Sequence, residues 1–266
     1  MSTGDVAHAC AVRVGDRQAE ALALDYIGSA YQELGLTEDA AENYLRALDV
    51  FPREGVRHEE GRIRGNLANA YQALRQFDEA INCYRLALEI FREISARDDE
   101  ATTLNNLGTA YRKIRKLDES LDCYGESLAI RRLLGDRIGE GATLNNLGAT
   151  YSILGRLDES VECYRQGAAI CRESGDGRGL GMILDNLGSV YLELHWLGEA
   201  MHCYKESRAI YQVIGDSYGE EQAAIRLAIA SGERESSRAE PVPVPTSRAS
   251  SAVGLIRRMV RHALAR

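Results

Sequence analysis

The chain has 266 residues, 45% of them hydrophobic, with three Phe, one Trp and four Pro. This composition favours packed helices over a sandwich of short strands, and no apolar run approaches the roughly 18 residues that a membrane span needs. The net charge is −8, and residues 233–266 carry seven Arg against three Glu, so the acidic excess lies in residues 1–232. An acidic body disfavours direct binding to nucleic acid.

The first residues have neither the cationic start nor the apolar core of a secretory signal. We therefore expect a cytoplasmic protein. Its six cysteines are expected to be free thiols, because that compartment keeps thiols reduced.

One octet recurs along the chain at a fixed interval of 40 residues. It reads LNNLGTAY from residue 104, LNNLGATY from residue 144 and LDNLGSVY from residue 184. The same register carries Tyr111 back to Tyr71 and Tyr31, so five copies align without an insertion. A fixed period of this length is typical of stacked helical repeats.

In chain order, residues 1–14 are predicted to form a partial N-terminal helix that belongs to an incomplete repeat, and residues 15–232 hold the repeat array. Each copy starts with a helix that we call helix A. In the third copy its apolar stripe occupies positions i, i+3, i+4 and i+7, the spacing of one helix face. These positions are Leu104, Leu107, Gly108 and Tyr111.

A second helix, helix B, follows in each copy. In the third copy its start carries Asp118 and Glu119, which favour the positive end of a helix dipole. Small residues are expected where two helices approach most closely. On helix A they are Gly28, Ala68, Gly108, Gly148 and Gly188, and on helix B they are Ala47, Ala87, Ser127, Gly167 and Ser207.

Glycines suited to a left-handed backbone are expected to end helix B, and aspartates that could cap the next helix come directly after most of them. Ser95 replaces the glycine in one junction. The glycines are Gly15, Gly55, Gly135, Gly175 and Gly215, and the aspartates are Asp16, Asp136, Asp176 and Asp216.

At the C-terminal end, residues 219–231 form a sixth helix A in which Leu227 is retained but Ser231 replaces the Tyr. Residues 233–251 are rich in Pro, Ser and charge, which predicts a disordered linker. Residues 252–266 are predicted to form a basic amphipathic helix. One side of that helix is apolar and the other carries Arg257, Arg258 and Arg261.

The N-L-G-x-x-Y helix A followed by a D-E-A/S-x-x-x-Y helix B resembles the tetratricopeptide repeat over roughly residues 16–231. The 40-residue period is similar to the longer-helix variant of kinesin light chains, Pins-type adaptors and bacterial signal-transduction regulator arrays. The resemblance implies an all-α fold, a right-handed α-solenoid of about five tetratricopeptide helix hairpins plus a C-terminal capping helix. The chain departs from the family pattern in lacking the Trp of helix A and the repeat-ending Pro.

In the resembled family, the face of helix A opposite the apolar stripe lines a concave groove. Stacking would align the second Asn of each octet into a ladder of amides that can donate to and accept from the backbone of an extended peptide. The other interpretation is that these Asn residues satisfy a neighbouring helix or a groove water. The candidate groove residues are Asn66, Asn69, Asn105, Asn106, Thr109, Arg112, Lys113, Asn145, Asn146, Asp185 and Asn186.

Charged residues on the same face predict a groove of mixed charge. Acidic residues lie near its ends and basic residues nearer its middle. The acidic residues are Asp25, Glu33, Asp185 and Glu193, and the basic residues are Arg62, Arg112 and Lys113.

No residue pattern predicts catalysis, a cofactor or a metal site. One cysteine column repeats every 40 residues, but thiols on successive repeats are expected about 10 Å apart, too far to share a zinc ion or form a disulfide. We interpret these residues as compact fillers at the edge of the core. They are Cys83, Cys123, Cys163 and Cys203.

The sequence therefore predicts a non-enzymatic scaffold that binds a peptide or helix of a partner protein in its groove, with a regulatory role. A second hypothesis is a self-assembly or autoregulatory module whose basic C-terminal helix docks on its own array. A third is a fragment of a larger signalling or transcriptional regulator. Only the C-terminal helix could contact a membrane surface, and the uncapped N-terminal end could support self-association.

Overall fold

The computed structural model of the chain describes residues 11–12, 15–51 and 57–238, with only the backbone of residues 233–238. These residues form helices and contain no strand. The helices are α2 (Arg17–Glu33), α3 (Thr37–Val50), α4 (Arg57–Ala73), α5 (Phe77–Glu93), α6 (Arg97–Lys113), α7 (Leu117–Leu134), α8 (Arg137–Ile153), α9 (Leu157–Ser174), α10 (Gly177–Glu193), α11 (Leu197–Ile214) and α12 (Ser217–Arg238).

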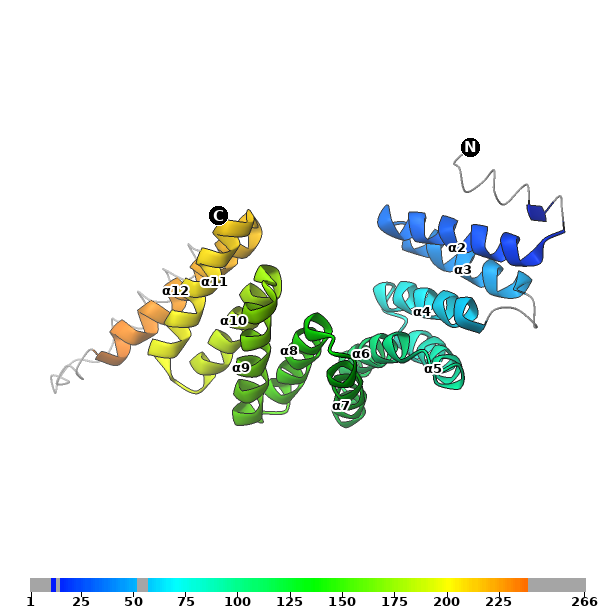
Figure 1. Cartoon of the computed structure of the whole chain (residues 1–266). Coiled ribbons are helices and arrows are strands. Elements are labelled where there is room, and N and C mark those ends of the chain that lie inside the picture. Colours follow the sequence, from blue (N-terminus) through cyan, green and yellow to red (C-terminus); the bar gives the residue numbers. More distant parts are fainter. Residues whose placement is uncertain (1–10, 13–14, 52–56, 239–266) are drawn as a thin grey trace, which may run out of the picture.

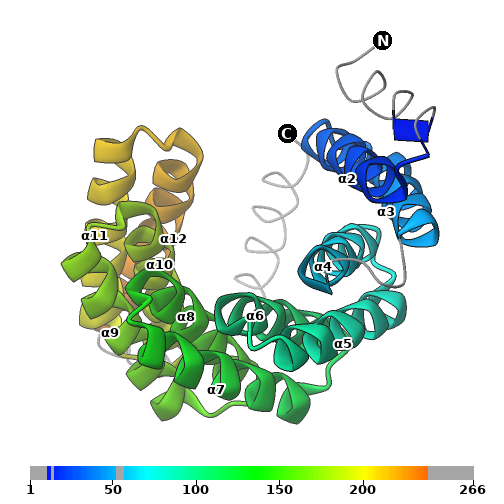
Figure 2. The ribbon, with the colours of Figure 1, turned by 45° about the vertical axis from the view of Figure 1, so that its right-hand side comes forward.

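The helices stack in sequence into a curved array (Figure 1), and each packs mainly against its neighbours along the chain. The even-numbered helices are the predicted A helices, and the odd-numbered helices from α3 to α11 are the predicted B helices. Figure 2 shows α4, α6, α8 and α10 on the inner side of the arc and α5, α7, α9 and α11 on its outer side. The prediction of an all-α solenoid is confirmed.

Close contacts between the two helices of a hairpin explain the small residues on helix A. A Cβ atom built on Gly28 would lie 2.8 Å from the ring of Tyr44. A Cβ atom built on Gly148 would lie at the same distance from the ring of Tyr164 in its own hairpin. The Tyr side chain of helix B therefore fills the space that a larger residue on helix A would need, as the sequence pattern predicted.

The helix ends also follow the sequence pattern. Gly135, Gly175 and Gly215 take the left-handed conformation with φ of 71°, 75° and 74°. The carboxylate of Asp136 accepts a hydrogen bond from the backbone N–H of Gly139 at 2.9 Å, which caps α8. Gly15 and Ser95 also have positive φ. The predicted turn at Gly55 lies outside the described residues.

A second set of left-handed turns, between the two helices of a hairpin, was not predicted. Gly35 and Gly155 occupy it in two repeats, and Arg75, Arg115 and His195 hold positive φ at the same register in the others. A non-glycine residue in this conformation costs about 1 kcal/mol or more. The spacing of Gly35 and Gly155 was the sequence signal for these turns.

At the C-terminal end, α12 continues to Arg238, six residues into the segment that the sequence assigned to a linker. Glu and Arg in this stretch have good intrinsic helix propensity, which is consistent with the extension. Residues 1–10, 13–14 and 239–266 lie outside the described residues, so the partial N-terminal helix and the basic C-terminal helix stay predictions. Among the described helices, none has the length and apolar character to cross a membrane.

Candidate functional site

Side-chain hydrogen bonds of the Asn residues link the A helices of successive repeats from α2 to α10. The side-chain N–H of Asn186 donates to Oδ1 of Asn145 at 2.9 Å, and that of Asn146 donates to Oδ1 of Asn105 at 3.1 Å. Each bond joins A helices of successive repeats. The same pattern continues toward the N-terminus, from Asn106 to Asn69 at 3.3 Å and from Asn66 to Asp25 at 3.0 Å.

These bonds match the interpretation in which each Asn satisfies a neighbouring helix, but they use only part of the hydrogen-bonding capacity of each amide. A side-chain amide has two N–H donors and a carbonyl oxygen with two lone pairs. Asn106, Asn146 and Asn186 each use one donor in the ladder, and all three are partly accessible. The ladder therefore holds the amides in fixed orientations while leaving hydrogen-bonding capacity for a ligand.

Two of the predicted groove residues bond to the core of their own hairpin. The hydroxyl of Tyr84 donates to Oδ1 of Asn69 at 2.6 Å, and the hydroxyls of Tyr124 and Thr109 lie 2.8 Å apart. Ser189 has the corresponding contact with Tyr204 at 3.2 Å. Asn69 and Thr109 therefore link the groove to the buried Tyr column, and their polarity is explained by the fold alone.

The two aspartates at the ends of the ladder are buried, in contrast to the expected mixed-charge groove surface. Asp25 is fully buried and lies 2.7 Å from a guanidinium nitrogen of Arg62. Asp185 pairs with Arg226 at 3.1 Å and accepts a hydrogen bond from Ser207 at 2.7 Å. Burial raises the pKa of Asp185, while Ser207, Arg226 and Tyr211 act in the opposite direction. The accessible acidic groups near the ends are instead Glu33 and Glu193.

Two adjacent A helices each leave a buried polar atom without a partner in the described part of the chain. Oε1 of Gln72 and Nε of Arg112 are buried, and neither makes a hydrogen bond with the described residues. They stand 40 residues apart, at the same register position of adjacent A helices. The neighbouring Lys113 is exposed. Sequence reasoning missed Gln72, although the repeat register pointed to it.

Two concavities flank α10. One of about 350 Å³ lies between α8 and α10, and one of about 410 Å³ lies between α10 and α12. Arg178 and Met182 line both. The predicted residues Asn145 and Asn146 line the first concavity, and Asp185 and Asn186 line the second. The groove thus has relief that could accept ligand side chains next to the ladder.

The cysteine column lies at the edge of the core, as predicted. Cys83 and Cys203 are buried, and Cys123 and Cys163 are half-buried. Burial raises the pKa of the Cys123 and Cys203 thiols to about 12 and that of Cys163 to about 11. Thiols with such pKa values are poor nucleophiles at neutral pH. Residues 11–12, 15–51 and 57–232 contain no group of three His, Cys, Asp or Glu side chains suited to hold a metal ion.

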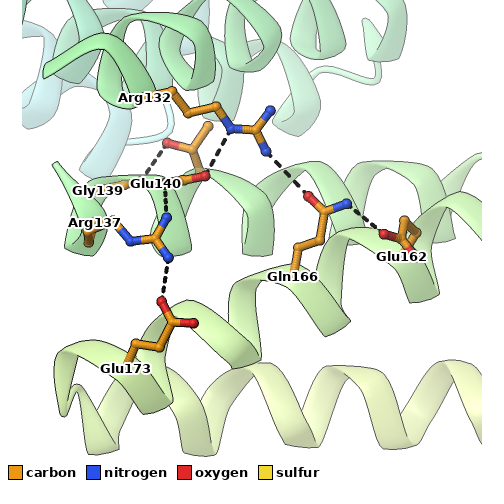
Figure 3. Close-up of polar contacts among 8 residues, drawn as sticks. Arg132, Arg137, Gly139, Glu140, Glu162, Gln166 and Glu173 are labelled. Carbon is orange, nitrogen blue, oxygen red and sulfur yellow. Dashed lines mark hydrogen bonds and ion pairs between the residues drawn. The ribbon is translucent and has the colours of Figure 1, made fainter. Parts of the chain in front are cut away.

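Ion pairs hold adjacent repeats together (Figure 3). The buried carboxylate of Glu140 forms ion pairs with Arg132 of α7 at 2.9 Å and with Arg137 of α8 at 2.7 Å. Arg137 continues to Glu173 at 2.6 Å, and Arg132 donates to Gln166 at 3.3 Å. In the preceding junction, Glu100 is paired in the same way with Arg92 and Arg97. Sequence reasoning missed this feature, although Glu60, Glu100, Glu140 and Glu220 are spaced by multiples of 40 residues.

Comparison with solved structures finds the same fold in several proteins. BtubC (BKLC) from P. vanneervenii is 20% identical, with a TM-score of 0.59 over 95% of this chain and 100% of that one. Aspartyl phosphate phosphatase F from Bacillus subtilis is 15% identical, with a TM-score of 0.75 over 85% of this chain and 60% of that one. A Rap protein complexed with competence and sporulation factor is 16% identical, with a TM-score of 0.66 over 84% of this chain and 67% of that one.

A search of curated proteins finds no match. A tetratricopeptide repeat profile matches residues 59–133 and 139–213, and a second tetratricopeptide repeat profile matches residues 26–54. The first profile alone covers more than half of the chain. The chain therefore belongs to the tetratricopeptide repeat family.

Proposed function

We propose that the protein is a non-enzymatic, regulatory scaffold whose inner groove binds an extended peptide segment of a partner protein. The observation that carries this proposal is the ordered amide ladder, in which Asn106, Asn146 and Asn186 each donate one hydrogen bond to the preceding A helix and remain partly accessible.

An extended peptide presents alternating backbone N–H and C=O groups, which complement these side chains. A peptide N–H could donate to Oδ1 of Asn106 or Asn146, and a peptide carbonyl could accept from the second side-chain N–H of the same amide. Because the ladder is already hydrogen-bonded within the array, little side-chain entropy would be lost on binding.

The comparison with the Rap protein in complex with competence and sporulation factor supports the proposal by analogy, since that complex shows a ligand bound to a similar fold. The cytoplasm is the location we propose. It is consistent with the five described cysteines, all of which are unpaired. Direct binding to nucleic acid is not part of the proposal, because the array is acidic.

Selection from a displayed library of random peptides on the immobilised full chain tests the groove. Peptides that bind should lose about tenfold or more in affinity when Asn146→Ala or Arg112→Ala is introduced, as measured by fluorescence polarisation. Asn82→Ala is the matched control, because Asn82 is an exposed amide on the outer helix α5. Failure to select any peptide, or equal losses in the groove and control variants, would contradict the proposal.

A further inference from the structure

The last helix of the array exposes an apolar stripe. Tyr218, Ile225 and Ile229 of α12 are 73%, 48% and 51% exposed. They are spaced at i, i+7 and i+11, which places them on one face of the helix. Ala223 and Ala230, on the opposite face, are fully buried against the rest of the array. Figure 1 shows α12 at the end of the stack, beside α11.

The repeat register explains why this stripe is unpartnered in residues 57–232. Ile225 stands at the position of Asn145 and Asp185 in earlier repeats. There, Asn145 accepts from Asn186 and Asp185 pairs with Arg226, each on the next A helix. No described helix follows α12, so Ile225 has no neighbouring A helix to meet, whereas Tyr218 lines the concavity that α12 forms with α10.

The chain itself continues with a segment suited to this face. Residues 239–251 connect the end of α12 to the amphipathic stretch 252–266. The apolar side of that stretch carries Val253, Leu255, Ile256, Met259, Val260, Ala263 and Leu264. As a helix, residues 253–264 would be about 18 Å long, comparable to the roughly 16 Å from Tyr218 to Ile229 along α12.

The connection has the reach that such an arrangement needs. Thirteen residues of flexible chain span about 18–22 Å on average. Ile229 lies nine residues before Arg238 on the same helix, which is a distance of about 14 Å. A covalent link of this length raises the effective concentration of the segment at α12 into the millimolar range.

Charge is compatible with docking of this segment on α12. Arg257, Arg258 and Arg261 make the segment basic. Beside the stripe, Glu221 is exposed, and the array as a whole carries the acidic excess.

We propose that residues 252–266 fold back as a helix onto the Tyr218, Ile225 and Ile229 face of α12 in the same molecule. The docked segment covers the exposed apolar residues of α12. The interaction does not depend on the proposed peptide-binding function.

Hydrogen–deuterium exchange of the full chain tests this arrangement. Backbone amides of residues 253–264 should exchange about tenfold or more slowly than those of the isolated tail peptide. The double variant Ile225→Ser with Ile229→Ser should return them to within about twofold of the peptide. A second double variant, Leu255→Ser with Met259→Ser, should speed exchange in α12 without changing α4–α10.

The matched control is Leu34→Ser with Leu133→Ser, two residues that are 74% and 87% exposed in other repeats. It should preserve tail protection, while unchanged exchange in α4–α10 shows that each variant is folded. Tail exchange at the rate of the free peptide in the unmodified chain would overturn the proposal. So would protection that rises with protein concentration, which indicates a second copy, or that appears only with phosphatidylserine vesicles, which indicates a membrane surface.

Discussion

The ring of Tyr124 lies directly against the backbone of Gly108, where a Cβ atom would be only 2.9 Å from Cε1 of the ring. The Tyr124 side chain is fully buried and its hydroxyl lies 2.8 Å from that of Thr109. Neither the ring nor helix α6 can move away without breaking other contacts of the hairpin. The hairpin geometry therefore depends on glycine at position 108.

Replacement of Gly108 by alanine should lower the free energy of unfolding by about 1–3 kcal/mol, because the added methyl group overpacks the hairpin. Gly65→Ala is the control, since a Cβ atom at Gly65, also in the middle of an A helix, meets no atom within 4 Å. That variant should gain about 0.5–1 kcal/mol from helix propensity. Urea unfolding followed by circular dichroism measures both, and a stabilised Gly108→Ala would refute the packing argument.

Glu140 should show opposite responses to truncation and to apolar replacement. Glu140→Ala leaves Arg132 and Arg137 without their shared carboxylate and creates a void, so we expect a loss of about 2 kcal/mol. Glu140→Leu should stay within about 1 kcal/mol of the unmodified chain, because Leu180 fills the same register position in the next repeat. Thermal or urea unfolding distinguishes the two, and equal losses would show that the charge itself is required.

Arg115 should be replaceable by glycine with a gain in stability. Its φ of 64° lies in the left-handed region, where Gly155 stands one repeat later with φ of 74°. Arg115→Gly removes the steric cost between Cβ and the backbone, worth about 1 kcal/mol. Arg115→Ala keeps that cost and removes the same exposed side chain, so its unfolding midpoint should stay near that of the unmodified chain.

The buried cysteines should make the array less stable at alkaline pH. The pKa values of Cys123 and Cys203, about 12 in the folded chain, exceed the ordinary thiol pKa of 9.0. Between pH 9 and 12 the unfolded chain loses these thiol protons while the folded chain keeps them, so the free energy of unfolding falls as pH rises. The slope is up to about 1.4 kcal/mol per pH unit for each thiol.

The double variant Cys123→Ala with Cys203→Ala should therefore lose less stability between pH 8 and 11 than the unmodified chain, measured as urea midpoints. A residual slope is expected, because burial also raises the pKa of Tyr84, Tyr164 and other tyrosines. The native thiols should also react slowly with a disulfide reagent at pH 8 and rapidly in urea. Fast reaction of the folded protein would contradict the burial of this column.

Much of the architecture could be predicted from the sequence, because a repeat that recurs every 40 residues states the same local preferences several times. Apolar spacing indicated the helices, small residues such as Gly148 marked the close contacts, and Gly135 with Asp136 marked a helix end and the next helix start. These features depend on interactions within a few residues or within one hairpin, so the linear pattern contains them.

The tertiary structure alone decided how the polar residues are used. Whether Asn146 bonds to Asn105, and whether Asp185 pairs with Arg226, depends on the rotation and spacing of successive helices. The same holds for Glu140 between its two arginines and for the exposed Ile225 and Ile229 at the end of the array. The physical reason is that a hydrogen bond or ion pair requires atoms to meet within about 3 Å, whereas the repeat pattern specifies only which side of a helix each residue occupies.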